Sequence, residues 1–297
     1  MSVTVRVPAK VNVQLAVGGA RDDGYHDLAN VFLAVGLYDE VTVTPADALT
    51  VSCSGPDADQ VPLDRTNLAA RAAELLAARH GIDPSVHIHI AKDIPVAGGM
   101  AGGSADGAGA LLACDALWGL GSPTSELLDI CAELGSDVPF SLVGGAALGT
   151  GRGERLTVLP VGGAFHWVFA VADGGLSTPA VYREFDRLNA DLDVPAPVAS
   201  TVLLDALRSG DAAALAGALV NDLQPAALSL RPSLADTLTA GTEAGALAGL
   251  VSGSGPTTAF LAKDETAARG IADALLASRT CRTARVAAAP ATGATVL

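Results

Sequence analysis

Aromatic side chains are scarce in this sequence, where phenylalanine, tryptophan and tyrosine make up 4% of 297 residues. Half of the chain is nevertheless hydrophobic, so its core must be built mainly from alanine, valine and leucine. Basic residues are also few: 18 lysines and arginines face 32 acidic residues, which gives a net charge of −14. This charge argues against nucleic acid or an anionic membrane as the main partner. A phosphate ligand would have to be held locally.

Cysteine is equally sparse, and the cysteines show neither the paired spacing of a metal site nor the density of a disulfide scaffold. They are Cys53, Cys114, Cys131 and Cys281. The N-terminal residues contain no apolar signal core, and the longest uncharged run, residues 244–262, is interrupted by Gly253, Gly255 and Pro256. We therefore expect reduced thiols, no membrane span and a cytoplasmic location.

Residues 94–113 combine a glycine-rich first half with a second half rich in alanine and leucine. We expect the second half to form a helix that reaches about Trp118, and the alternating segment 86–90 to form a strand before it. Glycines allow the backbone to approach a ligand closely, and a helix start offers unpaired N–H groups and a positive dipole end. These features predict a phosphate site that needs no basic side chain in the loop.

The alternative for this stretch is a loop that only turns the chain. Four glycines between Pro95 and Ser104, with a helix directly behind them, favour phosphate binding instead. The stretch lacks the Gly-Lys-Ser/Thr ending of a Walker loop. It also lacks an acidic residue at the end of a following strand, about 20 residues on, which the dinucleotide fingerprint requires.

Residues 3–17 predict either one long bent strand or a strand pair. Lys10, Asn12 and Gln14 share one face of such a strand, and all three are polar. An ordinary solvent-exposed face would explain this pattern equally well.

Two further segments have structural as well as functional interpretations. Tyr25 and His26 stand at the exit of a turn-rich loop, where they could simply pack. Asp137 lies two residues before Pro139, which is the pattern of a helix N-cap.

The remaining sequence alternates between helical and strand patterns, with a boundary between two lobes near residues 150–160. A helix over 68–79 should be capped by Thr66 or Asn67. The other expected helices cover 123–134, a segment carrying Tyr182, 203–219, 234–247 and 265–278. Strands are expected at 31–37, 40–44, 167–172, the end of 250–261 and 283–288, and residues 191–197 should form a linker.

Three elements now occur in order: residues 8–12, residues 95–106 and the Ser-Gly-Ser-Gly-Pro segment 252–256. Their order and spacing resembles the three motifs of the GHMP kinases, the small-metabolite kinases named for galactose, homoserine, mevalonate and phosphomevalonate. The Asp-Gly-Tyr-His segment 23–26, the Gly-Ser-Asp-Val-Pro-Phe segment 135–140 and the Leu-Ser-Thr segment 176–178 add detail to the resemblance. It covers about residues 5–262.

The resemblance implies an α/β fold of the α+β type with two lobes and an active site in the cleft between them. Residues 1–155 would form the ATP-binding lobe and residues 156–297 the substrate-binding lobe. The implied reaction is ATP-dependent phosphorylation of the 2-hydroxyl of a cytidine-diphosphate-bearing methylerythritol, a step of non-mevalonate isoprenoid biosynthesis.

Site residues follow from the same resemblance. Asp137 would be the catalytic base and Lys10 its partner. Asn12, Tyr25 and His26 would hold the cytidine-bearing substrate, and Tyr182 would stack on the cytosine. Asn67 would lie near the adenine pocket, and segment 252–256 would close the floor of the site. The ATP phosphate loop would consist of Pro95, Val96, Ala97, Gly98, Gly99, Met100, Ala101, Gly102, Gly103, Ser104 and Ala105.

The implied cofactors are ATP and Mg²⁺. No glutamate follows the loop to hold the metal, unlike in several relatives, which leaves the Ser104 hydroxyl as the candidate ligand. The alternatives are a GHMP kinase for mevalonate or homoserine, a nucleotide-binding module without catalysis, and a structural α/β protein. Tyr25, His26 and Tyr182 argue against the first alternative, and the Lys10–Asp137 pair argues against the second. The sequence leaves open a monomer or a weak dimer.

Overall fold

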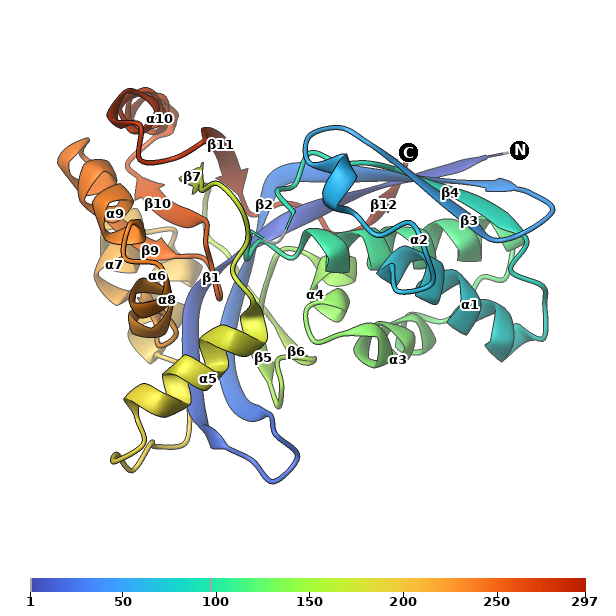
Figure 1. The fold of residues 1–297 in the computed structure, drawn as a ribbon, viewed down its shortest axis with the longest axis horizontal. Helices are drawn as coiled ribbons and strands as arrows, with labels where there is room; N and C mark the ends of the chain where they lie inside the picture. Colours follow the sequence, from blue (N-terminus) through green and yellow to red (C-terminus); the bar gives the residue numbers. More distant parts are fainter. Residues whose placement is uncertain (1, 97) are drawn as a thin grey trace.

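The computed structural model describes residues 2–96 and 98–297. Its described residues form two β-sheets with separate sets of helices, which confirms the expectation of two lobes (Figure 1). No helix in the described ranges is long and apolar enough to cross a membrane.

The first sheet contains eight strands in the described residues, in the path β12-β1-β2-β4-β3 with β5, β6 and β8 attached beside it. Its strands are β1 (Val3–Ala20), β2 (His26–Pro45), β3 (Thr50–Ser54), β4 (Val86–Ala91), β5 (Ala146–Thr150), β6 (Arg155–Leu159), β8 (Val220–Asn221) and β12 (Thr295–Val296). Its helices are the 3₁₀ helix η1 (Ala58–Gln60), α1 (Leu68–His80), α2 (Gly102–Trp118), α3 (Thr124–Leu134) and α4 (Val138–Val143).

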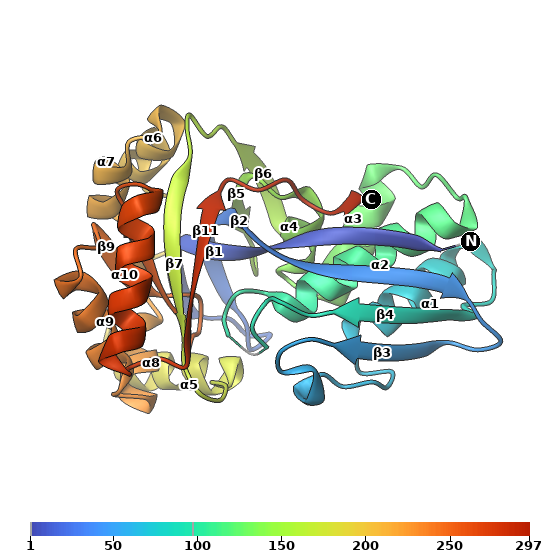
Figure 2. The same cartoon turned by 90° about the horizontal axis from the view of Figure 1, so that it is seen from above.

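The second sheet has four strands in the described residues, in the order β11-β7-β10-β9. They are β7 (Phe165–Val171), β9 (Ala248–Val251), β10 (Thr258–Ala262) and β11 (Thr283–Ala289). The helices of this half are α5 (Thr178–Leu188), α6 (Thr201–Ser209), α7 (Ala212–Ala218), α8 (Gln224–Leu230), α9 (Leu234–Glu243) and α10 (Glu265–Ser278). Helices α9 and α10 pack against this sheet (Figure 2).

Strands β1 and β2 connect the two halves, because this long antiparallel pair runs from the first lobe to the second (Figures 1 and 2). A single buried hydrophobic cluster extends along this strand pair into both halves. It contains Val7 and Val11 of β1 together with Trp167 and Phe169 of β7. Helix α2 lies very close to the pair, since a Cβ at Gly109 would come within 2.8 Å of side-chain atoms of Val7. Helix α2 therefore packs directly on the β1–β2 pair.

Local patterns predicted many elements well. Five elements lie where the sequence predicts them, and each predicted end agrees with the structure to within two residues: helices α1, α2 and α10 and strands β4 and β11. Asn67 caps α1, and its side-chain oxygen accepts a hydrogen bond from the N–H of Ala69 at 2.8 Å. Residues 191–197 contain no helix or strand, as expected for a linker.

Two predictions were wrong, and several elements were not predicted. The strands expected at 31–37 and 40–44 form one continuous strand, β2, because its partner β1 is continuous as well. The helix expected over 203–219 is split into α6 and α7 at Gly210, which adopts a left-handed φ of 72°. The 3₁₀ helix η1, the short helix α8 and strands β3, β5, β6, β8, β9 and β12 were not predicted.

The proposed division at residue 155 stays a prediction. Strand β6 continues the first sheet to Leu159, and β8 and β12 return to it from the second half of the chain.

Candidate active site

A cavity of about 880 Å³ opens between the two lobes. Strand β1, the glycine-rich loop and the start of α2 line it from the first lobe, while α5 and segment 253–255 line it from the second. The residues of the sequence prediction that line it are Lys10, Asn12, Tyr25, His26, Gly98, Gly99, Ala101, Gly102, Gly103, Ser104, Asp137 and Tyr182.

Lys10 and Asp137 meet in this cavity, with Lys10 Nζ 3.5 Å from Asp137 Oδ2. Lys10 is almost fully buried, so the solvent-exposed alternative for its strand face is wrong. Its Nζ also donates to Asn12 Oδ1 at 2.6 Å and to the carbonyl of Gly99 at 3.0 Å. The Asn12 amide in turn donates to Asn30 Oδ1 at 2.7 Å. A chain of buried polar groups thus fixes the ammonium group.

Asp137 occupies the N-cap position of α4, but its side chain makes no capping hydrogen bond. The sequence prediction that Asp137 is a helix N-cap is therefore correct for its position in the chain, but its side chain does not act as a cap. The carboxylate is partly exposed, at 31%, on the cavity wall. It is free to accept a proton from a bound hydroxyl group.

The glycine-rich loop ends where α2 begins, and residues 98, 99 and 101–104 line the cavity. Ala101 is the N-cap in a left-handed conformation with φ 62°, and it makes no side-chain cap. The first N–H groups of α2 are thus left for a ligand, as the phosphate-site prediction requires. Met100 and Ala105 are buried in the core instead, Pro95 and Val96 do not line this cavity, and Ala97 lies outside the described residues.

Segment 252–256 packs directly on this loop. Ser252 Oγ donates to the carbonyl of Gly99 at 3.1 Å. Gly99 has φ 75°, and a Cβ there would lie 2.1 Å from the carbonyl oxygen of Ser252. Asn221 holds this segment in place, since its side-chain amide donates hydrogen bonds to the carbonyls of Val251 and Gly253, both at 2.7 Å. No pattern in the sequence pointed to a role for Asn221.

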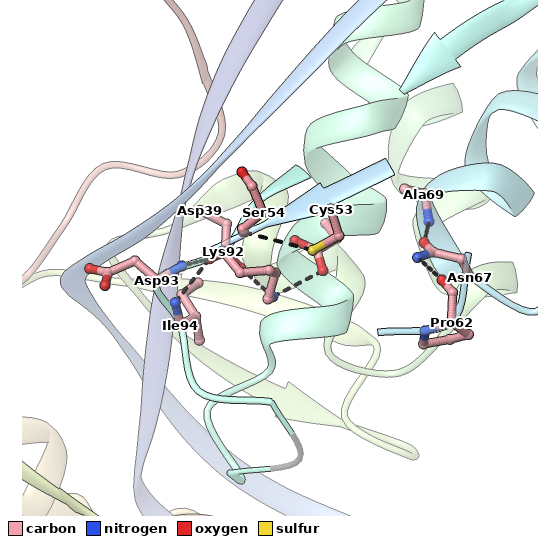
Figure 3. A network of polar contacts seen from close by, with 10 residues as sticks. Asp39, Cys53, Ser54, Pro62, Asn67, Ala69, Lys92, Asp93 and Ile94 are labelled. Atoms are coloured by element: carbon pink, nitrogen blue, oxygen red, sulfur yellow. Dashed lines mark hydrogen bonds and ion pairs between the residues drawn. The ribbon is translucent and has the colours of Figure 1, made fainter. Parts of the chain in front are cut away.

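A buried ion cluster lies beside the base of the loop (Figure 3). Lys92 Nζ donates to Asp39 Oδ2 at 2.5 Å and to Asp106 Oδ2 at 3.0 Å, and all three side chains are at most 4% exposed. Burial and the Asp39 carboxylate raise the pKa of Asp106 above the ordinary carboxyl value, although Lys92 opposes the shift. The two aspartates raise the pKa of Lys92 despite its burial.

The cluster holds both ends of the loop. Asp39 Oδ1 accepts hydrogen bonds from the backbone N–H groups of Asp93 at 2.7 Å and Ile94 at 2.9 Å (Figure 3). At the other end, the Lys92 ammonium lies 3.0 Å from the Cβ position of Gly102, the first residue of α2. Since its charge is matched by carboxylates, Lys92 supports the loop and is not a free phosphate-binding cation. Sequence reasoning missed this cluster.

Aromatic rings gather at the other end of the cavity. The rings of His26 and Tyr182 lie 5.0 Å apart between centroids, and His26 contacts Phe185 edge-on. Asp186 Oδ1, also on α5, accepts a hydrogen bond from His26 Nε2 at 2.8 Å. Tyr25 is half exposed at the cavity rim. The three aromatic residues named from the sequence are therefore brought together.

Asn67 does not line the cavity. It is buried at the start of α1, where its amide also donates to the carbonyl of Pro62 at 2.7 Å (Figure 3). Its predicted place near an adenine pocket stays a prediction.

Two family models match the chain: the N-terminal domain of GHMP kinases over residues 67–145 and the C-terminal domain over residues 203–279. The 4-diphosphocytidyl-2-C-methyl-D-erythritol kinases of Streptomyces avermitilis and Streptomyces coelicolor are 80% and 76% identical to it, each over 100% of both chains. A crystal structure of 4-(cytidine 5'-diphospho)-2C-methyl-D-erythritol kinase is 32% identical with a TM-score of 0.79, and the match covers 97% of this chain and 99% of that one. Homoserine kinase from Cytophaga hutchinsonii, 20% identical with a TM-score of 0.75 over 100% and 97% of the two chains, has the same fold.

Proposed function

The chain belongs to the GHMP kinase family, and we propose that it transfers the γ-phosphoryl group of ATP to the 2-hydroxyl of 4-diphosphocytidyl-2-C-methyl-D-erythritol. This is a step of non-mevalonate isoprenoid biosynthesis. Sequence identities of 80% and 76% over the full length to kinases of that name support this substrate assignment. The observation that carries the chemistry is the 3.5 Å approach of Lys10 and Asp137 in the cavity that the glycine-rich loop also lines.

Phosphoryl transfer needs placement of a hydroxyl group and stabilisation of charge on the transferred group. Asp137 accepts the hydroxyl proton as the oxygen attacks. Lys10 stabilises negative charge on the phosphoryl group during the transfer. Because Lys10 is also held by Asn12 and Gly99, its position does not depend on the charge of Asp137.

ATP binds with its phosphates against the loop and the first N–H groups of α2. No three His, Cys, Asp or Glu side chains among the described residues are grouped as metal ligands. A Mg²⁺ ion would therefore be held mainly by the phosphates, with the Ser104 hydroxyl on the cavity wall as a protein ligand. When bound, the ion neutralises charge on the phosphate oxygens.

The cytosine of the acceptor binds among Tyr25, His26 and Tyr182, where aromatic faces suit a planar base. Mevalonate and homoserine carry no such base, which disfavours the alternative substrates. Asn67 orders the segment beside α1 that we expect to border the adenine. Both substrates are water-soluble nucleotides, and we propose that the enzyme works in the cytoplasm.

The test is a coupled ADP-release assay with a panel of alcohols: 4-diphosphocytidyl-2-C-methyl-D-erythritol, mevalonate, homoserine and galactose. We expect turnover with the first compound alone. Turnover of mevalonate or homoserine in its place would refute the substrate assignment. ATP binding without ADP release for any alcohol would indicate a binding module instead of a kinase.

A further inference from the structure

Two arginines line the cavity without a carboxylate partner. Most arginines in residues 2–96 and 98–297 pair with an aspartate or glutamate, as expected in so acidic a protein. Within the same ranges, Arg152 and Arg183 form no ion pair, yet both line the cavity. Arg183 is exposed on α5, whereas Arg152 is only partly exposed. The unmatched charge of Arg152 is therefore available to an anionic ligand in the site.

Arg152 lies over the aromatic end of the cavity. Its guanidinium carbon is 4.9 Å from the centroid of the Tyr25 ring. Such stacking leaves the edge of the planar guanidinium group and its N–H donors open to a second partner. A phosphate is the partner that suits this group best, because its oxygens match the fork of donors.

The turn that carries Arg152 is built rigidly. Gly151 and Gly153 flank the residue with φ 70° and φ 105°, a region that favours glycine. Glu154 Oε2 accepts a hydrogen bond from the backbone N–H of Arg152 at 2.7 Å. The conformation of this turn therefore fixes the backbone position from which the Arg152 side chain extends.

The turn also lies between the two ends of the expected acceptor site. On one side, the N–H of Leu28, two residues after His26, donates to the carbonyl of Gly151 at 2.8 Å. On the other side, the Cβ position of Gly153 is 3.9 Å from Cβ of Ser136, the neighbour of Asp137. Arg152 is thus held between the aromatic residues and the carboxylate.

We propose that Arg152 binds the diphosphate group of the acceptor substrate. This inference rests on the proposed function. The acceptor is a linear molecule in which the diphosphate connects the cytidine to the alcohol. When the base is at the aromatic end and the hydroxyl group is at Asp137, the diphosphate has to cross the region beside Arg152.

The experiment compares Arg152→Gln with Arg152→Lys and with the control Arg155→Gln. Arg155 is 79% exposed three residues away and does not line the cavity. Steady-state kinetics give KM for the acceptor and for ATP, and calorimetry gives Kd for CDP and for cytidine. Cytidine keeps the base and lacks the phosphates, so it separates stacking from charge.

We expect Arg152→Gln to raise the acceptor KM about tenfold or more, with ATP KM changed less than about twofold. CDP binding should weaken while cytidine binding does not, Arg152→Lys should recover part of the loss, and Arg155→Gln should behave as wild type. An unchanged acceptor KM, a rise in ATP KM instead, or equal weakening of CDP and cytidine would each overturn the inference. A wild-type enzyme that phosphorylates no cytidine-bearing alcohol would refute the proposed function itself.

Discussion

The buried cluster beside the base of the phosphate loop predicts a large effect of Lys92→Met on stability. Methionine fills a similar volume but leaves Asp39 and Asp106 without their cation in a site that is at most 4% exposed. Removal of one member of a buried ion pair costs about 3–5 kcal/mol, because the remaining charge is uncompensated. We expect the free energy of unfolding in urea to fall by about this amount.

The matched control is Arg208→Met, which breaks the exposed Arg208–Asp205 pair at 3.0 Å. An exposed pair contributes about 1 kcal/mol or less. The double variant Lys92→Met, Asp106→Leu should be more stable than Lys92→Met alone, since it also removes a buried carboxyl whose Oδ1 has no hydrogen-bond partner in the described residues. Equal stability of Lys92→Met and wild type would refute the reasoning.

The same cluster predicts kinetic and pH effects. Because Asp39 fixes the start of the phosphate loop, Lys92→Met should raise KM for ATP more than KM for the acceptor. The raised pKa of Asp106 means that the folded protein keeps this proton to a higher pH than the unfolded chain. Its contribution to stability is therefore present at low pH and is lost as the pH rises from about 4, the ordinary carboxyl pKa, to about 8, the pKa of buried Asp106. Asp106→Asn should flatten this decline, and an unchanged pH profile of unfolding would contradict the assignment.

Three further substitutions test the site. Asp137→Asn should leave nucleotide binding nearly intact and reduce kcat about 100-fold or more; turnover near wild type would remove Asp137 from the mechanism. Tyr182→Ala should raise KM for the cytidine-bearing substrate more than KM for ATP, and equal effects would contradict stacking. Gly99→Ala places a Cβ 2.1 Å from a carbonyl oxygen at φ 75° and should weaken ATP binding at least about tenfold by calorimetry. Gly270→Ala, whose Cβ position has nothing within 4 Å, is its control, and normal affinity of Gly99→Ala would argue against a tightly packed loop.

The sequence predicted those features that depend on neighbouring residues. Helix α1 follows from its periodicity and its Asn67 cap, and α2 follows from the alanine- and leucine-rich run behind the glycines. The aromatic residues and the Lys10–Asp137 pair were found through the family resemblance, and their convergence could not be worked out from spacing. Local chemistry is enough to define an element, but it does not show which elements meet.

The features that the sequence did not reveal depend on distant partners. The polar face of β1 looks like a solvent face until Asn30 and Gly99 are placed beside Lys10 and Asn12. Asp39 lies in the gap between the two strands expected at 31–37 and 40–44, yet it is fully buried and paired with Lys92, 53 residues later. A buried charge is recognisable only together with its counter-ion.

The carbonyl oxygen of Gly99 explains why three motifs so far apart in the chain act together. It accepts a hydrogen bond from Lys10 Nζ and another from Ser252 Oγ, so the first and third motifs both hold the second. The same ammonium group lies 3.5 Å from Asp137. A shift of the glycine-rich loop therefore moves an acceptor atom of the lysine that pairs with Asp137, the carboxylate that we propose as the base. Under the proposed function, this shared atom couples the placement of ATP to the position of the base.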